Sequence, residues 1–238
     1  MLLVVRCLIL AIALVTVFVF SGLYCLLRPR HRDNVHVLAQ IFSKVSTVLG
    51  IKLVVRLPKV LPPAPNVYVA NHQNNYDIFT HTAVVPKGTV SIGKKSLAWI
   101  PFFGQLYWLS GNILIDRKNR HSAVSTMAKA AEKVRDEKLS VWVFPEGTRS
   151  RGRGLLPLKS GAFHTAIASG APVVPVVASS QNDIKLNRWN NGTVIIEMME
   201  PVATEGLAKS DVKQLSETVF HQMKAKLEQL DNEAAKLK

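Results

Sequence analysis

A histidine and an aspartate lie five residues apart in the segment 71–77, whose sequence is Asn-His-Gln-Asn-Asn-Tyr-Asp. The apolar run at 67–70 precedes it and predicts a buried strand that ends in a loop. Residues five positions apart lie about 140° apart around an α-helix, so the two side chains could not meet on one helix. If Asp77 is the N-cap of a helix over 78–85, the loop can fold His72 back onto the carboxylate. Asp77 would then hold the Nδ1 proton and leave Nε2 to accept a proton from a substrate hydroxyl, as a general base does.

Such a spacing also occurs in ordinary surface loops, so a second cluster of polar residues matters. It follows the apolar run at 140–144, another predicted strand, and its sequence from position 145 is Pro-Glu-Gly-Thr-Arg-Ser-Arg-Gly-Arg. Proline and glycine force a turn at the strand end, where α/β folds place ligand sites. Arginine suits bidentate phosphate binding, so the turn predicts a phosphate-binding rim with Arg149 nearest the strand. For Arg151 and Arg153 a solvated basic loop explains the pattern equally well.

These two segments and two others resemble, in order and composition, the four signature blocks of the glycerolipid acyltransferases. The blocks lie at 71–77, 111–117, 144–149 and 171–176, and Leu114 stands where many members carry phenylalanine. The resemblance is strongest to the short bacterial members, which acylate 1-acyl-glycerol-3-phosphate to give phosphatidic acid. It therefore implies an acyltransferase of phospholipid biosynthesis that acts at a membrane.

The resemblance and the residue types together predict the site. We expect His72 and Asp77 to be catalytic, and Arg117 and Arg149 to bind the acceptor phosphate. Of the adjacent lysines at 94 and 95, we nominate Lys95 as a third phosphate ligand, although a solvated pair fits equally well.

Glu146 would repel a phosphate, so we expect it to accept a hydrogen bond from a glycerol hydroxyl or to hold an arginine. Gly147 permits close backbone approach, and Thr148 either donates a hydrogen bond or caps the turn. The expected substrate-binding set is Lys95, Arg117, Glu146, Gly147, Thr148 and Arg149, with Pro172 and Pro175 as an apolar wall for the acyl chain.

Acyl transfer from a thioester to an alcohol requires a base and a stabilised oxyanion, but no enzyme nucleophile, because a thioester is already activated. The sequence has no Gly-x-Ser-x-Gly motif, and Cys7 and Cys25 both lie in the apolar amino-terminal segment. We therefore expect direct attack by the acceptor hydroxyl, with departure of the thiol of coenzyme A or of an acyl-carrier protein. No histidine has a partner at metal-ligand spacing, so we expect no metal, and no cofactor beyond the acyl thioester.

The chain has 238 residues and a formal net charge of +14. This charge indicates an anionic partner, and nucleic acid, anionic lipid headgroups or an acidic carrier protein would each qualify. No zinc-finger spacing, RNP-type block or basic heptad-bearing helix is present, so nucleic acid is the least favoured of the three. The sequence carries no prediction of an oligomeric state.

Residues 7–27 contain no charged side chain and, as a helix, would extend about 31 Å, which is the hydrocarbon thickness of a bilayer. Arginines follow at positions 28, 30 and 32, against Arg6 alone before the segment, which places the rest of the chain in the cytoplasm. A cleaved signal peptide is the alternative, but no clear A-x-A cleavage site is present. We expect a retained anchor in the bacterial inner membrane, with the catalytic domain on its cytoplasmic face.

Residues 35–50 place apolar side chains at helical spacing opposite a polar face. Core packing and contact with a membrane interface explain this pattern equally well. The first helix either spans the bilayer or pairs with the second helix in one leaflet. We assign residues 1–50 to a two-helix membrane anchor and residues 51–238 to the acyltransferase domain.

From residue 51 strands and helices alternate, which predicts an α/β fold with a mixed, largely parallel sheet covered by helices. We expect strands at 51–56, 67–70, 90–93, 112–115, 140–144, 173–178 and 193–199. We expect helices at 78–85, 121–137, 161–169 and 211–235. For the aromatic-rich stretch with Trp99, Phe102, Phe103 and Trp108, we favour a core position over a membrane-interface belt or an acyl-chain tunnel.

Three alternatives stand beside this function. A related acyltransferase would take another phosphorylated acceptor, such as glycerol 3-phosphate, or a lysophospholipid with a headgroup. A non-catalytic, membrane-docked lipid-binding protein would use the same basic face without releasing a thiol. A membrane-attached nucleic-acid binder is supported by charge alone and predicts affinity that falls steeply with salt.

Overall fold

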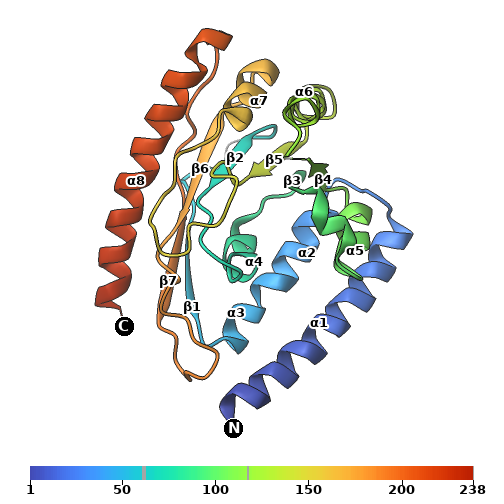
Figure 1. Cartoon of the computed structure of the whole chain (residues 1–238), viewed down its shortest axis with the longest axis vertical. Helices are drawn as coiled ribbons and strands as arrows, with labels where there is room; N and C mark the ends of the chain where they lie inside the picture. The colour runs from blue at the N-terminus through green and yellow to red at the C-terminus, as the bar shows by residue number, and fades with distance from the viewer. Residues whose placement is uncertain (61–62, 117, 238) are drawn as a thin grey trace.

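The computed structural model describes residues 1–60, 63–116 and 118–237 (Figure 1). Its centre is a seven-stranded sheet in the order β1-β7-β6-β2-β5-β3-β4. The strands are β1 (Lys52–Arg56), β2 (Val67–Ala70), β3 (Thr89–Lys94), β4 (Ile113–Ile115), β5 (Ser140–Val143), β6 (Val173–Ala178) and β7 (Thr193–Met198). Each neighbouring pair is parallel except β6 and β7, which are antiparallel. The predicted mixed, largely parallel sheet is confirmed, and the strand ends differ from the predicted ones by no more than one residue.

Helices cover both faces of this sheet (Figure 1), which is why its central strands are continuous apolar runs. Along β2, Val67 and Val69 belong to the core that includes α6 (Arg120–Asp136), α7 (Gly161–Ser169) and α8 (Val212–Lys236). Tyr68 and Ala70 point to the opposite face, toward α2 (Asn34–Ser43). The helices predicted at 121–137, 161–169 and 211–235 are present as α6, α7 and α8.

The helix predicted at 78–85 is a shorter α4 (Asp77–Thr80) that continues as the 3-10 turn η1 (His81–Val84). The predicted N-cap role of Asp77 is wrong, because the helix already includes Asp77. Its carboxylate instead accepts hydrogen bonds from the backbone of the preceding loop. The predicted second helix at 35–50 is also interrupted, at Lys44, between α2 and α3 (Val45–Val48).

Helix α1 (Leu2–Leu27) begins five residues before the predicted span and so includes Arg6. Among the described residues it is the one helix long and apolar enough to cross a membrane. One face packs around Cys25, Phe42 and Leu106. The other face exposes a continuous apolar stripe of Val4, Leu8, Ile12, Val15, Val19, Leu23 and Leu26.

The aromatic stretch lies on η2 (Lys95–Trp99) and α5 (Phe103–Leu109), two short helices that the sequence pattern did not predict. Trp99, Phe102 and Trp108 are 83%, 76% and 53% exposed, so the expected core position is wrong for these three. The physical reason is that α5 packs through Gly104 and Leu106, which leaves its other side uncovered.

Candidate active site

The residues singled out by the sequence converge at one edge of the sheet. Strands β2, β5 and β3 are parallel neighbours, so their carboxyl ends meet there. The loop 71–77 follows β2, the turn that begins at Phe144 follows β5, and Lys94 is the last residue of β3. Helices α2 and α5 lie over this edge and close a cavity around it.

The imidazole of His72 and the carboxylate of Asp77 are in contact. Nδ1 of His72 lies 2.6 Å from Oδ2 of Asp77, and since a carboxylate can only accept, Nδ1–H is the donor. This arrangement leaves the lone pair on Nε2. The ring stacks on Phe144 with 4.2 Å between centroids. The backbone N–H of His72 donates to Oε1 of Glu146 at 2.5 Å, and its carbonyl accepts from the N–H of Ser150 at 2.8 Å.

Asp77 is itself held by four donors. Oδ2 also accepts the backbone N–H groups of Gln73 at 2.8 Å and Asn74 at 3.2 Å. Oδ1 accepts from Nε2 of Gln181 at 2.9 Å. A buried charge needs such compensation, and only 3% of Asp77 is exposed. The carboxylate therefore has a single position from which it can orient His72.

Gln181 is a site residue that the sequence analysis missed. It lies beyond the fourth signature block, in the loop after β6, so neither a motif nor the resemblance pointed to it. Its side chain is 1% exposed, and its backbone N–H donates to Oε1 of Gln73 at 3.0 Å. The available signal was positional, because β6 is a parallel neighbour of β2 and ends at the same edge.

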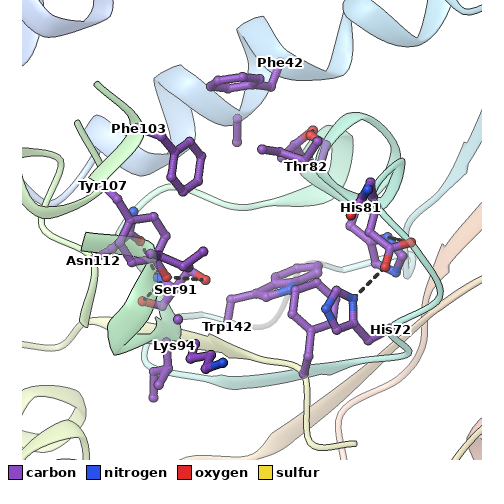
Figure 2. Close-up of a pocket in the computed structure, with 18 of the residues that line it drawn as sticks. Phe42, His72, His81, Thr82, Ser91, Lys94, Phe103, Tyr107, Asn112 and Trp142 are labelled. Carbon is purple, nitrogen blue, oxygen red and sulfur yellow. Dashed lines mark hydrogen bonds and ion pairs between the residues drawn. The ribbon is translucent and has the colours of Figure 1, made fainter. Parts of the chain in front are cut away.

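A second imidazole, that of His81, lies behind the pair. Its Nδ1 is 3.8 Å from Oδ1 of Asp77, and its Nε2 is 3.3 Å from Oδ1 of Asn71. Burial lowers the pKa of His81 and outweighs the carboxylate of Asp77, which raises it. The neutral form of the ring is therefore favoured. Both imidazoles line the cavity, as Figure 2 shows.

Glu146 binds backbone N–H groups and is not among the described residues that line the cavity. Its Oε1 accepts the N–H of His72, and its Oε2 accepts the N–H of Leu156 at 2.9 Å. It is 3% exposed, and burial raises its pKa to about 7 despite the two N–H donors, which lower it. The expected contact with a glycerol hydroxyl or an arginine stays a prediction, because each oxygen binds one backbone N–H and keeps a further lone pair, and the charge of Arg153 lowers the pKa of Glu146. Glu146 joins the loop 71–77 to the turn after β5 that carries Arg149.

The cavity has a volume of about 550 Å³ and both polar and apolar lining residues. Its polar lining includes His72, Lys94, Gly147, Thr148, Arg149 and Arg151. Its apolar lining includes Leu38, Phe42, Ile92, Leu97, Phe103 and Leu106. Figure 2 shows Phe42 and Phe103 on the far side of the space from His72. An amphiphile with an anionic head fits such a space, with its head at the cations and its chain among the apolar side chains.

The other predicted ligands divide between the cavity and places outside it. Gly147, Thr148 and Arg149 line it as expected, and so does Arg151, whose position the sequence left open. Lys94 lines it where Lys95 was predicted, and Lys95, the first residue of η2, is not among the described residues that line it. Arg117 lies outside the described residues.

The predicted acyl-chain wall of Pro172 and Pro175 is wrong. The carbonyl of Pro172 accepts the N–H of Val67 at 2.9 Å, at the amino ends of β2 and β6 and so at the opposite edge of the sheet from His72. Pro175 alternates along β6 with Val174 and Val176, which pack on the α2 face, so it points to the face covered by α7 and α8. The described residues that line the cavity include neither proline.

The fold and site define a class of protein: an α/β enzyme with a hydrogen-bonded histidine–aspartate pair at a cavity lined by cations and apolar side chains. The acyltransferase family model matches residues 52–179, and the chain belongs to this family.

Similar proteins cover nearly the whole chain. The 1-acyl-sn-glycerol-3-phosphate acyltransferase of Salmonella typhimurium is 47% identical over 237 residues, which are 99% of this chain and 97% of the relative. The human 1-acyl-sn-glycerol-3-phosphate acyltransferase alpha is 38% identical over 203 residues, 84% of this chain and 72% of the relative. The crystal structure of the 1-acyl-sn-glycerophosphate acyltransferase PlsC from Thermotoga maritima superposes with a TM-score of 0.74 at 26% identity, covering 95% of each chain.

Proposed function

We propose that this enzyme transfers a fatty acyl group from an acyl thioester to the free hydroxyl of 1-acyl-glycerol-3-phosphate, which gives phosphatidic acid. The observation that carries the proposal is the contact between His72 and Asp77 at a cavity with both polar and apolar lining residues. The names of the bacterial and human relatives support the same acceptor.

His72 is the general base of the proposed reaction. As the acceptor oxygen bonds to the thioester carbonyl carbon, Nε2 accepts the hydroxyl proton. The tetrahedral intermediate then expels the thiolate, which takes the proton from the imidazolium. Asp77 stabilises that imidazolium and keeps Nδ1 protonated throughout, as in other histidine–aspartate pairs.

Lys94 and Arg149 are the proposed ligands of the acceptor phosphate. Both line the cavity that His72 also lines, and arginine provides a two-pronged donor for phosphate oxygens. Arg151 adds a third positive charge to this lining. The acceptor chain would then lie toward Leu38 and Phe42.

The donor is an acyl thioester of coenzyme A or of an acyl-carrier protein, and we propose that the reaction uses no further cofactor. Either thiol leaves without forming a covalent enzyme intermediate. The positive charge at the cavity would suit the phosphates of coenzyme A and an acidic carrier protein alike.

We propose that the enzyme sits at the bacterial inner membrane with its cavity on the cytoplasmic side. The arginines that follow α1 support this orientation. Helix α1 contacts the domain near its start and again in its second half: Arg6 donates to the carbonyl of Trp189 at 2.7 Å, and Phe18 packs on Phe103 at 6.4 Å. Contact along this length favours a helix that lies along the domain over one that leaves it to cross the bilayer.

The test is a matrix of acyl donors and acceptors assayed with purified wild-type protein and with His72→Ala. We expect thiol release that depends on 1-acyl-glycerol-3-phosphate in the wild type and loss of at least about 10³-fold in the variant. His221→Ala is the matched control, because His221 is exposed on α8. Near-wild-type turnover by a folded His72→Ala protein would refute the base, and a preference for glycerol 3-phosphate would refute the acceptor.

A further inference from the structure

Exposed aromatic side chains gather around one helix. Among the residues that the structure describes, the exposed Phe and Trp side chains are Phe20, Trp99, Phe102, Trp108 and Trp189. Phe20 belongs to α1, and the other four lie in segments that contact α1 or its two ends. Aromatic rings at this density on a bare surface are typical of a membrane interface.

The contacts at the ends of α1 fix two of these side chains. Near its start, the guanidinium of Arg6 lies 5.9 Å from the ring of Trp189. Just beyond its end, the guanidinium of Arg30 lies 5.2 Å from the ring of Trp108. The two tryptophans therefore flank the exposed apolar stripe of the helix.

Trp99 and Phe102 lie beside the helix itself. Phe103, the first residue of α5, packs edge-on against Phe18 with 6.4 Å between centroids. Phe18 is nine residues from the end of α1, which corresponds to roughly 14 Å along the helix axis. With α1 lying along the membrane surface, as its contacts with the domain favour, the residues next to Phe18 lie at the membrane interface together with the exposed stripe of the helix.

The backbone of this loop is strained in a way that exposes an aromatic ring. Phe102 has a φ of +63° and a ψ of −46°, and the N–H of Phe103 donates to the carbonyl of Pro101 at 2.7 Å, which makes a γ-turn of the rare and strained form. The ring of Phe102 is 76% exposed, so packing within the domain does not compensate that strain. Strained residues of this kind cluster at functional sites.

We propose that residues 99–102, here called the aromatic loop, insert into the lipid bilayer as a second membrane contact, separate from α1. The loop consists of Trp99, Ile100, Pro101 and Phe102, all of which are exposed. It extends the exposed apolar stripe of α1 onto the catalytic domain.

Charge favours a bilayer as the occupant of this surface. Residues 1–32 and 78–115, which form it, contain no Asp or Glu, so insertion buries no carboxylate. Lys94, Lys95 and Arg30 are exposed around the loop and would meet anionic headgroups. A second copy of the chain would instead bring these cations against one another.

The inner side of the same segment lines the cavity, through Leu97, Phe103 and Tyr107. The segment is therefore a wall with the proposed active site on one side and lipid on the other. An acceptor dissolved in the bilayer would then enter the cavity by passing this wall. This part of the inference rests on the proposed function, because it requires a lipid acceptor.

The test uses the full chain bound to phospholipid vesicles whose acyl chains carry bromine, a quencher of tryptophan emission. The difference between wild type and Trp99→Phe isolates the emission of Trp99. We expect a loss of roughly twofold or more, greatest for shallow bromine positions, since interfacial elements reach about 5–10 Å into the bilayer. In the control, Trp99→Phe combined with Val124→Trp, the new tryptophan should show no loss, because Val124 is exposed on α6.

The outcomes separate the inference from the proposed function. Unquenched Trp99 in a protein that still binds vesicles and transfers acyl groups would overturn the inference alone. A dimer that dissociates in Trp99→Ser combined with Phe102→Ser would also overturn it, since the loop would then be a protein interface. Quenched Trp99 without any acyl transfer would support the loop and refute the function.

Discussion

Gln181→Met should lower the rate of acyl transfer through Asp77, without any contact between Gln181 and the substrate. Methionine has a similar length and shape but no N–H, so the change removes the 2.9 Å hydrogen bond to Oδ1 of Asp77. A buried hydrogen bond to a charged group contributes about 1.5–3 kcal/mol. If that stabilisation is fully expressed when His72 becomes an imidazolium, kcat should fall by roughly 10- to 100-fold.

The assay is initial-rate kinetics with saturating donor and a varied lysophospholipid acceptor. A positioning role predicts that kcat falls while the acceptor KM stays within about twofold. Gln229→Met provides the control, because Gln229 is exposed on α8 and bonds only to Glu233 in the same helix among the contacts recorded. The melting temperatures of both variants, measured in the same detergent, separate loss of fold from loss of rate.

Two results would refute this reasoning. A folded Gln181→Met protein with wild-type kcat would mean that the loop donors Gln73 and Asn74 suffice to orient Asp77. A raised KM with unchanged kcat would mean that Gln181 acts on the acceptor instead.

Four other variants test the remaining parts of the site. Asp77→Asn should lower kcat by about 10⁴-fold, the scale found when the aspartate of another histidine–aspartate pair is neutralised, and a loss below tenfold would contradict its orienting role. Glu146 has a folded-state pKa of about 7, above its ordinary 4.5, so it favours the folded state fully below pH 4.5 and this contribution is lost as pH rises through 7. Glu146→Gln should therefore reduce the pH dependence of the free energy of unfolding. The difference between pH 5 and pH 8, measured by denaturant titration, should change by up to about 3 kcal/mol. Lys94→Ala should raise the acceptor KM about tenfold and Lys95→Ala should not, and equal effects would contradict the assignment of the phosphate site.

Much of the sheet could be predicted because its strands are short apolar runs bounded by turn residues. Strands β2 and β6 have the predicted ends, since burial on both faces makes the whole run apolar and proline or polar residues stop it. The contact between His72 and Asp77 followed from excluding a shared helix. Both inferences used local sequence alone.

Other features depended on packing between distant segments. Helix α5 has only seven residues, too few for a clear apolar period, so its exposed tryptophan resembled a core residue in the sequence. The role of Glu146 depends on where Leu156 folds back, ten residues along the chain. The orientation of Pro175 depends on which side of β6 faces the cavity, and a strand buried on both sides does not reveal this in its sequence.

The connection between β6 and β7 binds both the candidate active site and the start of helix α1. Near the start of the connection, Gln181 donates a hydrogen bond to the carboxylate of Asp77, and a few residues later the carbonyls of Leu186, Arg188 and Trp189 accept hydrogen bonds from Arg6. Arg6 is 5% exposed although it belongs to the most apolar helix of the chain. Removing the first six residues to gain solubility would therefore leave three carbonyl groups without their shared donor. Those carbonyls lie on the same connection whose Gln181 binds Asp77.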